Sequence, residues 1–210
     1  MATPTTAMSS RRGRGARERI ERAAAKLFYR HGIHATGVEL VAQQANVSKR
    51  TLYQHFASKQ DLVDNYLRAI DARGGSPMER RVDNPDLPAR DRLLAVFDAS
   101  PVDIFRGCPF HNAAVESAGA LPSTDAIVRN HKLEFTRRLV AIAHEAGAAD
   151  PHLLGHQLTV LFDGATAMAT SLNDTAPLVH ARAAAATLID AATETPITDI
   201  RNEGRPLSHK

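Results

Sequence analysis

Residues 49–55, Lys-Arg-Thr-Leu-Tyr-Gln-His, hold the densest group of side chains that can bind another molecule. Ser48 precedes them as a helix N-cap residue, and Leu52 and Phe56, four residues apart, share one face of the helix that would follow. A helix over Lys49–Phe56 therefore turns its cationic and hydrogen-bonding side chains outward. Such side chains contact phosphates and base edges in the major groove of DNA. The residues expected to face DNA are Lys49, Arg50, Thr51, Tyr53, Gln54 and His55.

The charge is unevenly distributed along the 210-residue chain, whose net charge is +3. Residues 1–75 carry 13 Lys and Arg against 6 Asp and Glu, whereas the remainder carries 13 against 17. A basic first third favours a polyanionic partner, although a solvated basic tail without a ligand is the alternative. The cluster between Arg11 and Arg19 is typical of an arm that becomes ordered on DNA. Further contacts are expected from Arg11, Arg12 and Arg14 in that arm, and from Thr36 and Lys59 at helix starts.

A three-helix helix-turn-helix domain, followed by a fourth helix, is expected to position these side chains. Apolar residues recur with helical spacing from Arg17 to Arg30, and a short amphipathic helix follows Thr36 and ends at Asn46, which tolerates a left-handed backbone. The helix over Lys49–Phe56 is the third, and a fourth runs from Lys59 to Ile70. Two short helices joined by a tight turn predict a helix-turn-helix. We assign residues 1–15 to a basic flexible arm and residues 16–73 to a DNA-binding domain.

The rest of the chain is also expected to be helical, so the predicted fold class is all-α. Gly74–Pro88 is rich in Gly and Pro and reads as a linker. Beyond it, residues 74–194 are assigned to a larger effector-binding and dimerisation domain, and residues 195–210 to a flexible tail. The expected helices span about 89–99, 110–119, 123–146, 151–173 and 177–194. No β-hairpin signal is present, and alanine, the best helix former, is abundant.

The run from Thr36 to Leu62, TGVELVAQQANVSKRTLYQHFASKQDL, resembles the DNA-binding signature of the tetracycline-repressor (TetR) family. The resemblance extends back over Ile20–Gly32 and is carried by Tyr53, Phe56 and Lys59 at this spacing. Asn46 stands where the family usually has glycine. The resemblance implies an all-helical homodimeric repressor that binds a palindromic double-stranded operator. It also implies that a small-molecule effector, unidentified from the sequence, binds the C-terminal region and releases the DNA.

The C-terminal helices contain candidates for both the dimer interface and the effector pocket. Apolar and small residues recur in 151–173, including Leu154, Leu158, Ala165, Met168 and Leu172, and in 177–194, including Leu178, Ala181 and Ala185. They can form a four-helix dimer interface, with packing inside one chain as the alternative. A pocket walled by aromatics with a few polar groups is the usual small-molecule site, although each aromatic can equally be plain core. The expected ligand-binding residues are Phe97, Phe105, Phe110, His111, Asn112, His131, Phe135, Leu139, Phe162 and Asp163.

Other function classes have weaker support. Cys108 and His111 are residue types that can act as a nucleophile and a base. The sequence places no third catalytic group with them, and Pro109 fits better as the first residue of a helix, so no enzyme is expected. The alternative function is a metal- or redox-responsive DNA-binding regulator. It would use Cys108 or histidines. His152 and His156 are four residues apart and share one face of a helix, and His111 and His131 are further candidates from other parts of the chain. We expect no cofactor. One cysteine, no apolar stretch of membrane-spanning length and no secretory signal predict a cytoplasmic protein without membrane contact.

Overall fold

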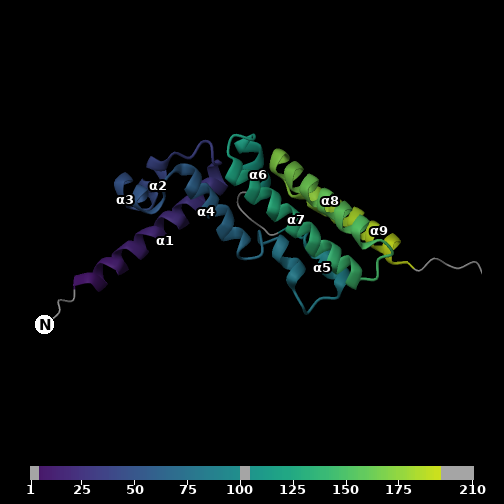
Figure 1. Ribbon diagram of the computed structural model, residues 1–210. Coiled ribbons are helices and arrows are strands. Elements are labelled where there is room, and N and C mark those ends of the chain that lie inside the picture. Colours follow the sequence, from purple (N-terminus) through teal and green to yellow (C-terminus); the bar gives the residue numbers. More distant parts are fainter. Residues whose placement is uncertain (1–4, 100–104, 195–210) are drawn as a thin grey trace, which may run out of the picture.

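The computed structural model describes residues 5–99 and 105–194, with side chains from residue 15 onward. Within these ranges the chain forms nine α-helices and one 3-10 helix and contains no strand, in agreement with the all-α prediction (Figure 1). The elements are α1 (Thr5–His31), α2 (Val38–Gln44), α3 (Lys49–His55), α4 (Lys59–Asp71), η1 (Glu79–Asp83), α5 (Ala89–Ala95), α6 (Pro109–Ser117), α7 (Pro122–Glu145), α8 (Pro151–Leu172) and α9 (Ala176–Thr193). None of the described helices is both long and apolar enough to cross a membrane.

Helices α1 to α4 form the N-terminal bundle, and local sequence signals set their ends. The Ser48 hydroxyl accepts a hydrogen bond from the Thr51 N–H at 3.0 Å, and Ser58 caps α4 in the same way. Asn46 has φ of 52°, so the left-handed residue expected between α2 and α3 is confirmed. Leu52 and Phe56 are almost completely buried, which holds α3 against α1 and α2.

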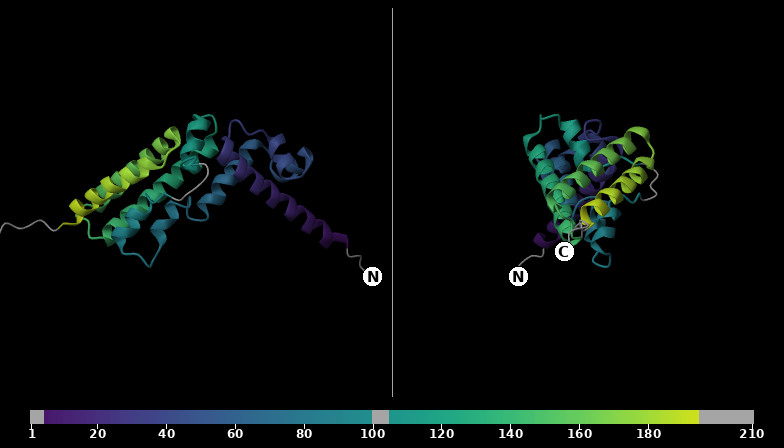
Figure 2. Two further views of the ribbon diagram at one scale, coloured as in Figure 1. Left: turned by 180° about the vertical axis from the view of Figure 1, so that it is seen from behind. Right: turned by 90° about the vertical axis from the view of Figure 1, so that its right-hand side faces the viewer.

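Helix α1 is longer than its apolar periodicity predicts. It begins at Thr5 rather than near Arg17, so the segment expected to be an arm continues the helix. The N-terminal part of α1 projects away from the other helices in the left view of Figure 2. Side chains before residue 15 lie outside the described part, so the DNA contacts of Arg11, Arg12 and Arg14 remain predictions.

The segment expected to be a linker, Gly74–Pro88, is packed into the molecule and includes η1. Glu79 and Val82 are fully buried, and Ser76 is 7% exposed. Arg138 of α7 donates hydrogen bonds to the carbonyl oxygens of Gly74 and Glu79 at 2.9 and 3.2 Å. Contacts with α7 therefore give the segment an ordered structure that its Gly and Pro content does not predict.

The C-terminal helices begin close to the expected residues because proline occupies N1 or N2 in four of them. Helices α7 and α8 come close together at Gly155, and α9 packs along α8 (Figure 2). Most of the periodic apolar residues expected at a dimer interface instead pack inside the chain. The buried ones are Leu154, Leu158, Ala165, Leu178, Ala181 and Ala185. Met168 and Leu172, expected at the same interface, are exposed.

The apolar side chains form two separate cores. The second core joins η1 and α5 with α7, α8 and α9. The first core fills the N-terminal bundle, but it also takes in Cys108, Phe110 and Ala113 from the start of α6, and Val128 from α7. Residues 16–73 therefore do not complete their core by themselves.

Candidate nucleic-acid interface and ligand cavity

Helix α3 presents the predicted DNA-facing side chains on its outer surface. Arg50, Tyr53 and Gln54 are exposed, with Tyr53 at 43%, and none has a hydrogen bond or ion pair within the described ranges. Leu52 on the opposite face is buried. The helix therefore offers one cationic group, one phenol and one amide to an external partner.

Other predicted contacts are engaged within the protein. Lys49 forms an ion pair with Glu39 of α2, and the Glu39 carboxylate raises the pKa of Lys49 by its hydrogen bond. The Thr51 and Ser48 hydroxyls lie 2.9 Å apart, and Lys59 donates to the His34 carbonyl at 3.2 Å. These groups must exchange a partner inside the chain for a phosphate, so their contribution to DNA affinity is smaller than that of free side chains.

Thr36 does not fit its predicted role as a phosphate contact. Its side chain is fully buried, and its hydroxyl donates to the carbonyl of Gly32 at 2.7 Å. Its N–H is directed to the Ile33 carbonyl at 3.4 Å. Thr36 therefore closes the turn after α1 and is not accessible to DNA.

Two arginines of the N-terminal cluster support the helix-turn-helix itself. Arg17 donates to the His55 carbonyl at 3.3 Å, and its guanidinium lies 4.6 Å from the centroid of the Phe56 ring. Arg19 donates to the Ala45 carbonyl at 3.0 Å. Since unpaired carbonyls at a helix C-terminus attract cations, these side chains stabilise the ends of α3 and α2. The positive charge of Arg17 and Arg19 does not by itself indicate that they stabilise helix ends.

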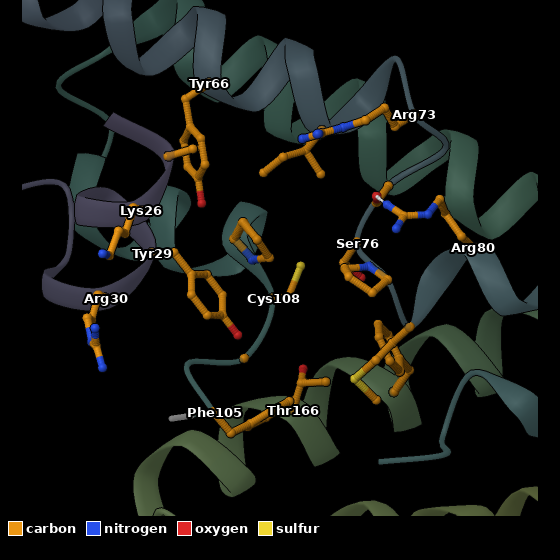
Figure 3. Close-up of a pocket in the computed structure, with 18 residues that line it drawn as sticks. Lys26, Tyr29, Arg30, Tyr66, Arg73, Ser76, Arg80, Phe105, Cys108 and Thr166 are labelled. Atoms are coloured by element: carbon orange, nitrogen blue, oxygen red, sulfur yellow. Dashed lines mark hydrogen bonds between the residues drawn. The ribbon is translucent and has the colours of Figure 1, made fainter. Parts of the chain in front are cut away.

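A cavity of about 580 Å³ lies between the N-terminal bundle and the C-terminal helices (Figure 3). Two of the predicted ligand-binding residues line it, Phe105 and Phe162. Its other walls come from α1, α4, α8 and the segments 75–80 and 107–109. These lining residues are Ala25, Lys26, Tyr29, Arg30, Tyr66, Ile70, Arg73, Gly75, Ser76, Pro77, Met78, Arg80, Gly107, Cys108, Pro109 and Thr166.

The other predicted ligand residues lie elsewhere. Phe97, Phe135 and Leu139 are packed in the second core. Asp163 accepts a hydrogen bond from Lys132 at 2.5 Å. His111 and Asn112 border a separate depression together with Arg106 and Glu116, and Asn112 donates to the Arg106 carbonyl.

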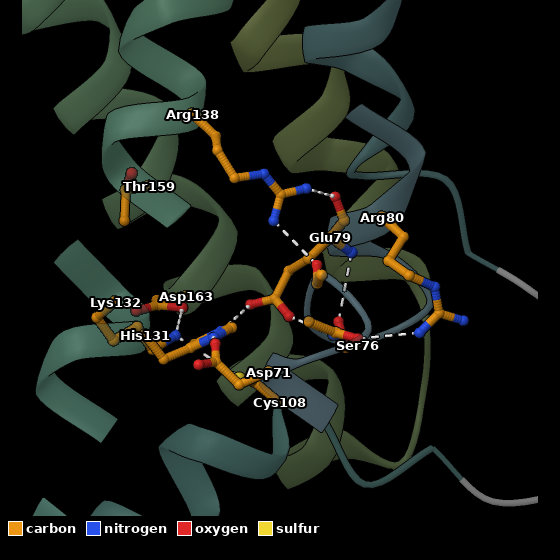
Figure 4. A network of polar contacts seen from close by, with 12 residues as sticks. Asp71, Ser76, Glu79, Arg80, Cys108, His131, Lys132, Arg138, Thr159 and Asp163 are labelled. Carbon is orange, nitrogen blue, oxygen red and sulfur yellow. Dashed lines mark hydrogen bonds and ion pairs between the residues drawn. The ribbon is translucent and has the colours of Figure 1, made fainter. Parts of the chain in front are cut away.

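Phe110 and His131 belong to a buried polar network and not to the cavity wall. Their rings stack with centroids 3.4 Å apart and an interplanar angle of 5°. The ring nitrogens of His131 lie 2.8 Å from an Asp71 oxygen and 3.0 Å from a Glu79 oxygen (Figure 4). Burial is the largest single influence on Glu79 and opposes its ionisation. The hydrogen bond and charge of His131, the Ser76 N–H and the Lys132 charge together outweigh burial, so the Glu79 pKa is lowered. This network ties the end of α4 to η1 and α7.

Cys108 is buried at the cavity wall. Burial raises the pKa of its thiol to about 11, although Lys132 Nζ lies 3.6 Å from Sγ. A protonated, buried thiol is a poor nucleophile and reacts slowly with oxidants. His152 and His156 are both exposed, and no group of three metal-ligating side chains occurs in the described part of the chain.

The cavity residues missed in the sequence follow a readable pattern. Lys26, Tyr29 and Arg30 share one face of α1, whereas Tyr66 lies on α4 and Arg73 lies in the turn that follows α4. The α1 face combines an aromatic and two cationic residues away from the apolar stripe of that helix, whereas Tyr66 also belongs to the first core. Such a second face is the sequence signal that indicates these cavity residues. The aromatic residues of the C-terminal half do not indicate them.

Comparison with known proteins identifies the family of this fold. The model of a family described as bacterial regulatory proteins, tetR family, matches residues 20–66. The transcriptional activator FasR of Mycolicibacterium smegmatis is 42% identical over 76 residues, which are 36% of this chain and 30% of FasR. The transcriptional repressor KstR2 of Mycobacterium tuberculosis is 36% identical over 108 residues, 51% of this chain and 49% of KstR2. The chain thus spans half or less of the length of these curated relatives.

Solved structures match over nearly their whole length. A TetR transcriptional regulator from Streptomyces avermitilis is 33% identical, with a TM-score of 0.66 over 84% of this chain and 97% of that one. A TetR-family regulator from Streptomyces coelicolor is 27% identical, with a TM-score of 0.70 over 92% and 98%. The likeness therefore covers the C-terminal helices as well as the helix-turn-helix.

Proposed function

Because this chain belongs to the tetR family of bacterial regulatory proteins, we propose that it is a dimeric, DNA-binding transcriptional repressor released by a small-molecule effector. The observation that carries the proposal is the outer face of α3, where Arg50, Tyr53 and Gln54 are exposed and unpaired within the described residues. A helix of this kind fits the major groove, where Arg can bind guanine and Gln can bind adenine bidentately. The match to a repressor, KstR2, over half of the chain supports repression.

The outer face of α8 and α9 is the proposed dimer interface. Its exposed large apolar side chains are Leu153, Val160, Met168 and Leu172 on α8 and Val179 on α9. Val160 is 73% exposed. An apolar stripe of this kind on a single chain marks a protein–protein contact. A two-fold dimer would set the two α3 helices one helical turn of DNA apart, about 34–36 Å.

The metal- and redox-responsive alternative has little support. The Cys108 thiol is buried and its pKa is raised to about 11 by that burial, which keeps it in the less reactive protonated form. The helical pair His152 and His156 is exposed, and His156 Nδ1 lies 2.8 Å from the His152 carbonyl oxygen. We therefore retain the ligand-released repressor as the proposal.

In vitro selection of bound DNA from a random pool tests the proposal directly. Enriched sequences should be palindromic, and titrations at fixed salt should show sub-micromolar or tighter binding of them, as in specific complexes. Arg50→Ala and Tyr53→Ala should each weaken this binding by roughly 1–3 kcal/mol. Arg129→Ala, on the exposed surface of α7, is the matched control and should bind normally. Failure to enrich any sequence, or equal binding by all three variants, would refute the DNA-binding assignment.

The dimer is tested by the mass of the protein in solution. Val160→Asp places a charge on the proposed interface without disturbing the core of the single chain, because Val160 is exposed. We expect this variant to be monomeric in analytical ultracentrifugation and to keep its helical circular dichroism spectrum. A variant that remains dimeric would place the interface elsewhere.

A further inference from the structure

We propose that the cavity between α1, α4 and α8 binds an organic anion that has an apolar body, and that this anion is the effector. The inference rests on the proposed function, because an effector role requires that the protein bind DNA. The cavity itself does not depend on that function. Its volume is about 580 Å³, which is within the size range of small-molecule sites.

The charge of the lining selects the class of ligand. Four cations line the cavity, Lys26, Arg30, Arg73 and Arg80, and no described carboxylate does. Figure 3 places Lys26 and Arg30 on one side of the cavity and Arg73 and Arg80 on the other. Cations gathered around one cavity without a counter-charge create a positive potential that an anion neutralises.

Three of these four exposed cations also lack partners in the described part of the protein, whereas Arg80 donates a hydrogen bond to the Gly75 carbonyl at 3.0 Å. Lys26, Arg30 and Arg73 make no hydrogen bond or ion pair with the part of the chain that the structure describes. Other arginines of the same chain are paired, for example Arg90 with Asp190 and Arg182 with Asp98. A carboxylate, sulfonate or phosphate entering the cavity can therefore form charge-assisted hydrogen bonds without displacing an existing partner.

A hydroxyl that faces the cavity offers a hydrogen bond to a polar ligand group. Tyr66 is only 7% exposed, and its hydroxyl points into the cavity without a hydrogen-bond partner among the described residues (Figure 3). The hydroxyl oxygen is accessible from the cavity, so it can donate a hydrogen bond to a group bound there. A ligand oxygen that accepts from the Tyr66 hydroxyl would form this bond.

The walls between the charged edges are apolar. Ile70, Met78, Phe105 and Phe162 line the cavity and give the ligand body a surface from which water is excluded. An inorganic anion would leave these walls unfilled, and a neutral hydrocarbon would leave the cations unpaired. The lining as a whole therefore fits an anion attached to an aliphatic or aromatic body.

The position of the cavity explains how ligand binding can change the affinity for DNA. Its α1 and α4 walls belong to the bundle that carries α3, whereas Phe162 and Thr166 lie on α8. A ligand that touches both halves favours one separation of them. If that separation differs from the DNA-bound one, the ligand weakens DNA binding by the same factor as DNA weakens ligand binding.

The test uses three probes with the same ten-carbon chain and different head groups. Decanoate, decan-1-ol and decylamine are titrated into the full-length protein below their aggregation concentrations, with calorimetry as the readout. Decanoate should bind at least about tenfold more tightly than the alcohol, as expected for charge-assisted hydrogen bonds, and more weakly as salt is raised. Decylamine should not bind. Equal binding of decanoate and decan-1-ol would overturn the anion assignment.

Two cavity variants and one matched control locate the site. Arg73→Gln and Tyr66→Phe should each weaken decanoate binding, Arg73→Gln by about tenfold. Arg129→Gln, which removes an exposed cation outside the cavity, should leave it unchanged. Equal weakening of decanoate binding by Arg73→Gln and Arg129→Gln would show that decanoate binds through general charge attraction and would refute the site.

Measurements on selected DNA separate this inference from the proposed function. Ligand-free protein that binds no DNA would refute the proposed function, whatever decanoate does. When the ligand-free protein binds DNA, decanoate should release it from the wild type and release far less from Arg73→Gln. Decanoate binding with unchanged DNA affinity would overturn the effector role.

Discussion

Replacing Gly155 by alanine should destabilise the protein, although the same change in an exposed helix normally stabilises it. A Cβ at Gly155 would lie 2.4 Å from Val140 Cγ2, 2.8 Å from its backbone N and 2.9 Å from its Cα. Alanine gains about 1 kcal/mol of helix propensity over glycine. Overpacking costs about 1–3 kcal/mol, and the upper end applies because two of the three close atoms belong to the α7 backbone. The net loss of stability is about 2 kcal/mol.

Urea denaturation and thermal melting measure this destabilisation. For a chain of this length the melting temperature should fall by about 4–8 °C. In the Val140→Ala background, which removes Cγ2, the further destabilisation on adding Gly155→Ala should be smaller, and the double-mutant cycle gives that difference directly. A Gly155→Ala protein as stable as the wild type would refute the close approach of α7 and α8, and an additive cycle would assign the clash to the Val140 backbone instead of Cγ2.

Three further predictions concern other parts of the molecule. Phe56→Ala empties a buried aromatic site and should cost about 3–5 kcal/mol by urea unfolding, and near-wild-type stability would remove Phe56 from the core. The Cys108 thiol has a pKa of about 11 in the folded protein against 9.0 unperturbed, so the unfolded chain loses the proton first. Stability should therefore fall by about 2 kcal/mol between pH 9 and 11, and Cys108→Ala should lack that slope. Deleting residues 1–15 should lower the salt slope of DNA binding by up to about 0.9 for each phosphate that this segment neutralises, and an unchanged slope would place the segment off the DNA.

The elements that local signals control were predictable from the sequence. Pro151 and Asp150 begin α8 at the expected residue, and Ser48 and Asn46 set the turn before α3. Each of these residues acts on backbone groups within a few positions of itself. Short-range effects of this kind are therefore predictable from the sequence.

The features that depend on distant residues were not predictable in this way. Glu79 is buried in a segment with linker composition because His131, 52 residues away, binds it. Phe110 and Phe105 have the same residue type, yet one stacks on His131 and the other lines the cavity. Aromatic character indicates burial but does not distinguish a core from a pocket wall.

The composition of the first core limits how hybrid regulators can be assembled from this protein. Its N-terminal bundle is completed by Phe110 and Ala113 of α6 and Val128 of α7, and Thr124 donates to the buried Asp64 of α4 at 2.6 Å. A chimera joined at residue 74 would separate these partners and leave apolar surface and a buried carboxylate uncovered. The transferable unit is therefore discontinuous in sequence, and it consists of residues 16–73 together with α6 and the first turns of α7.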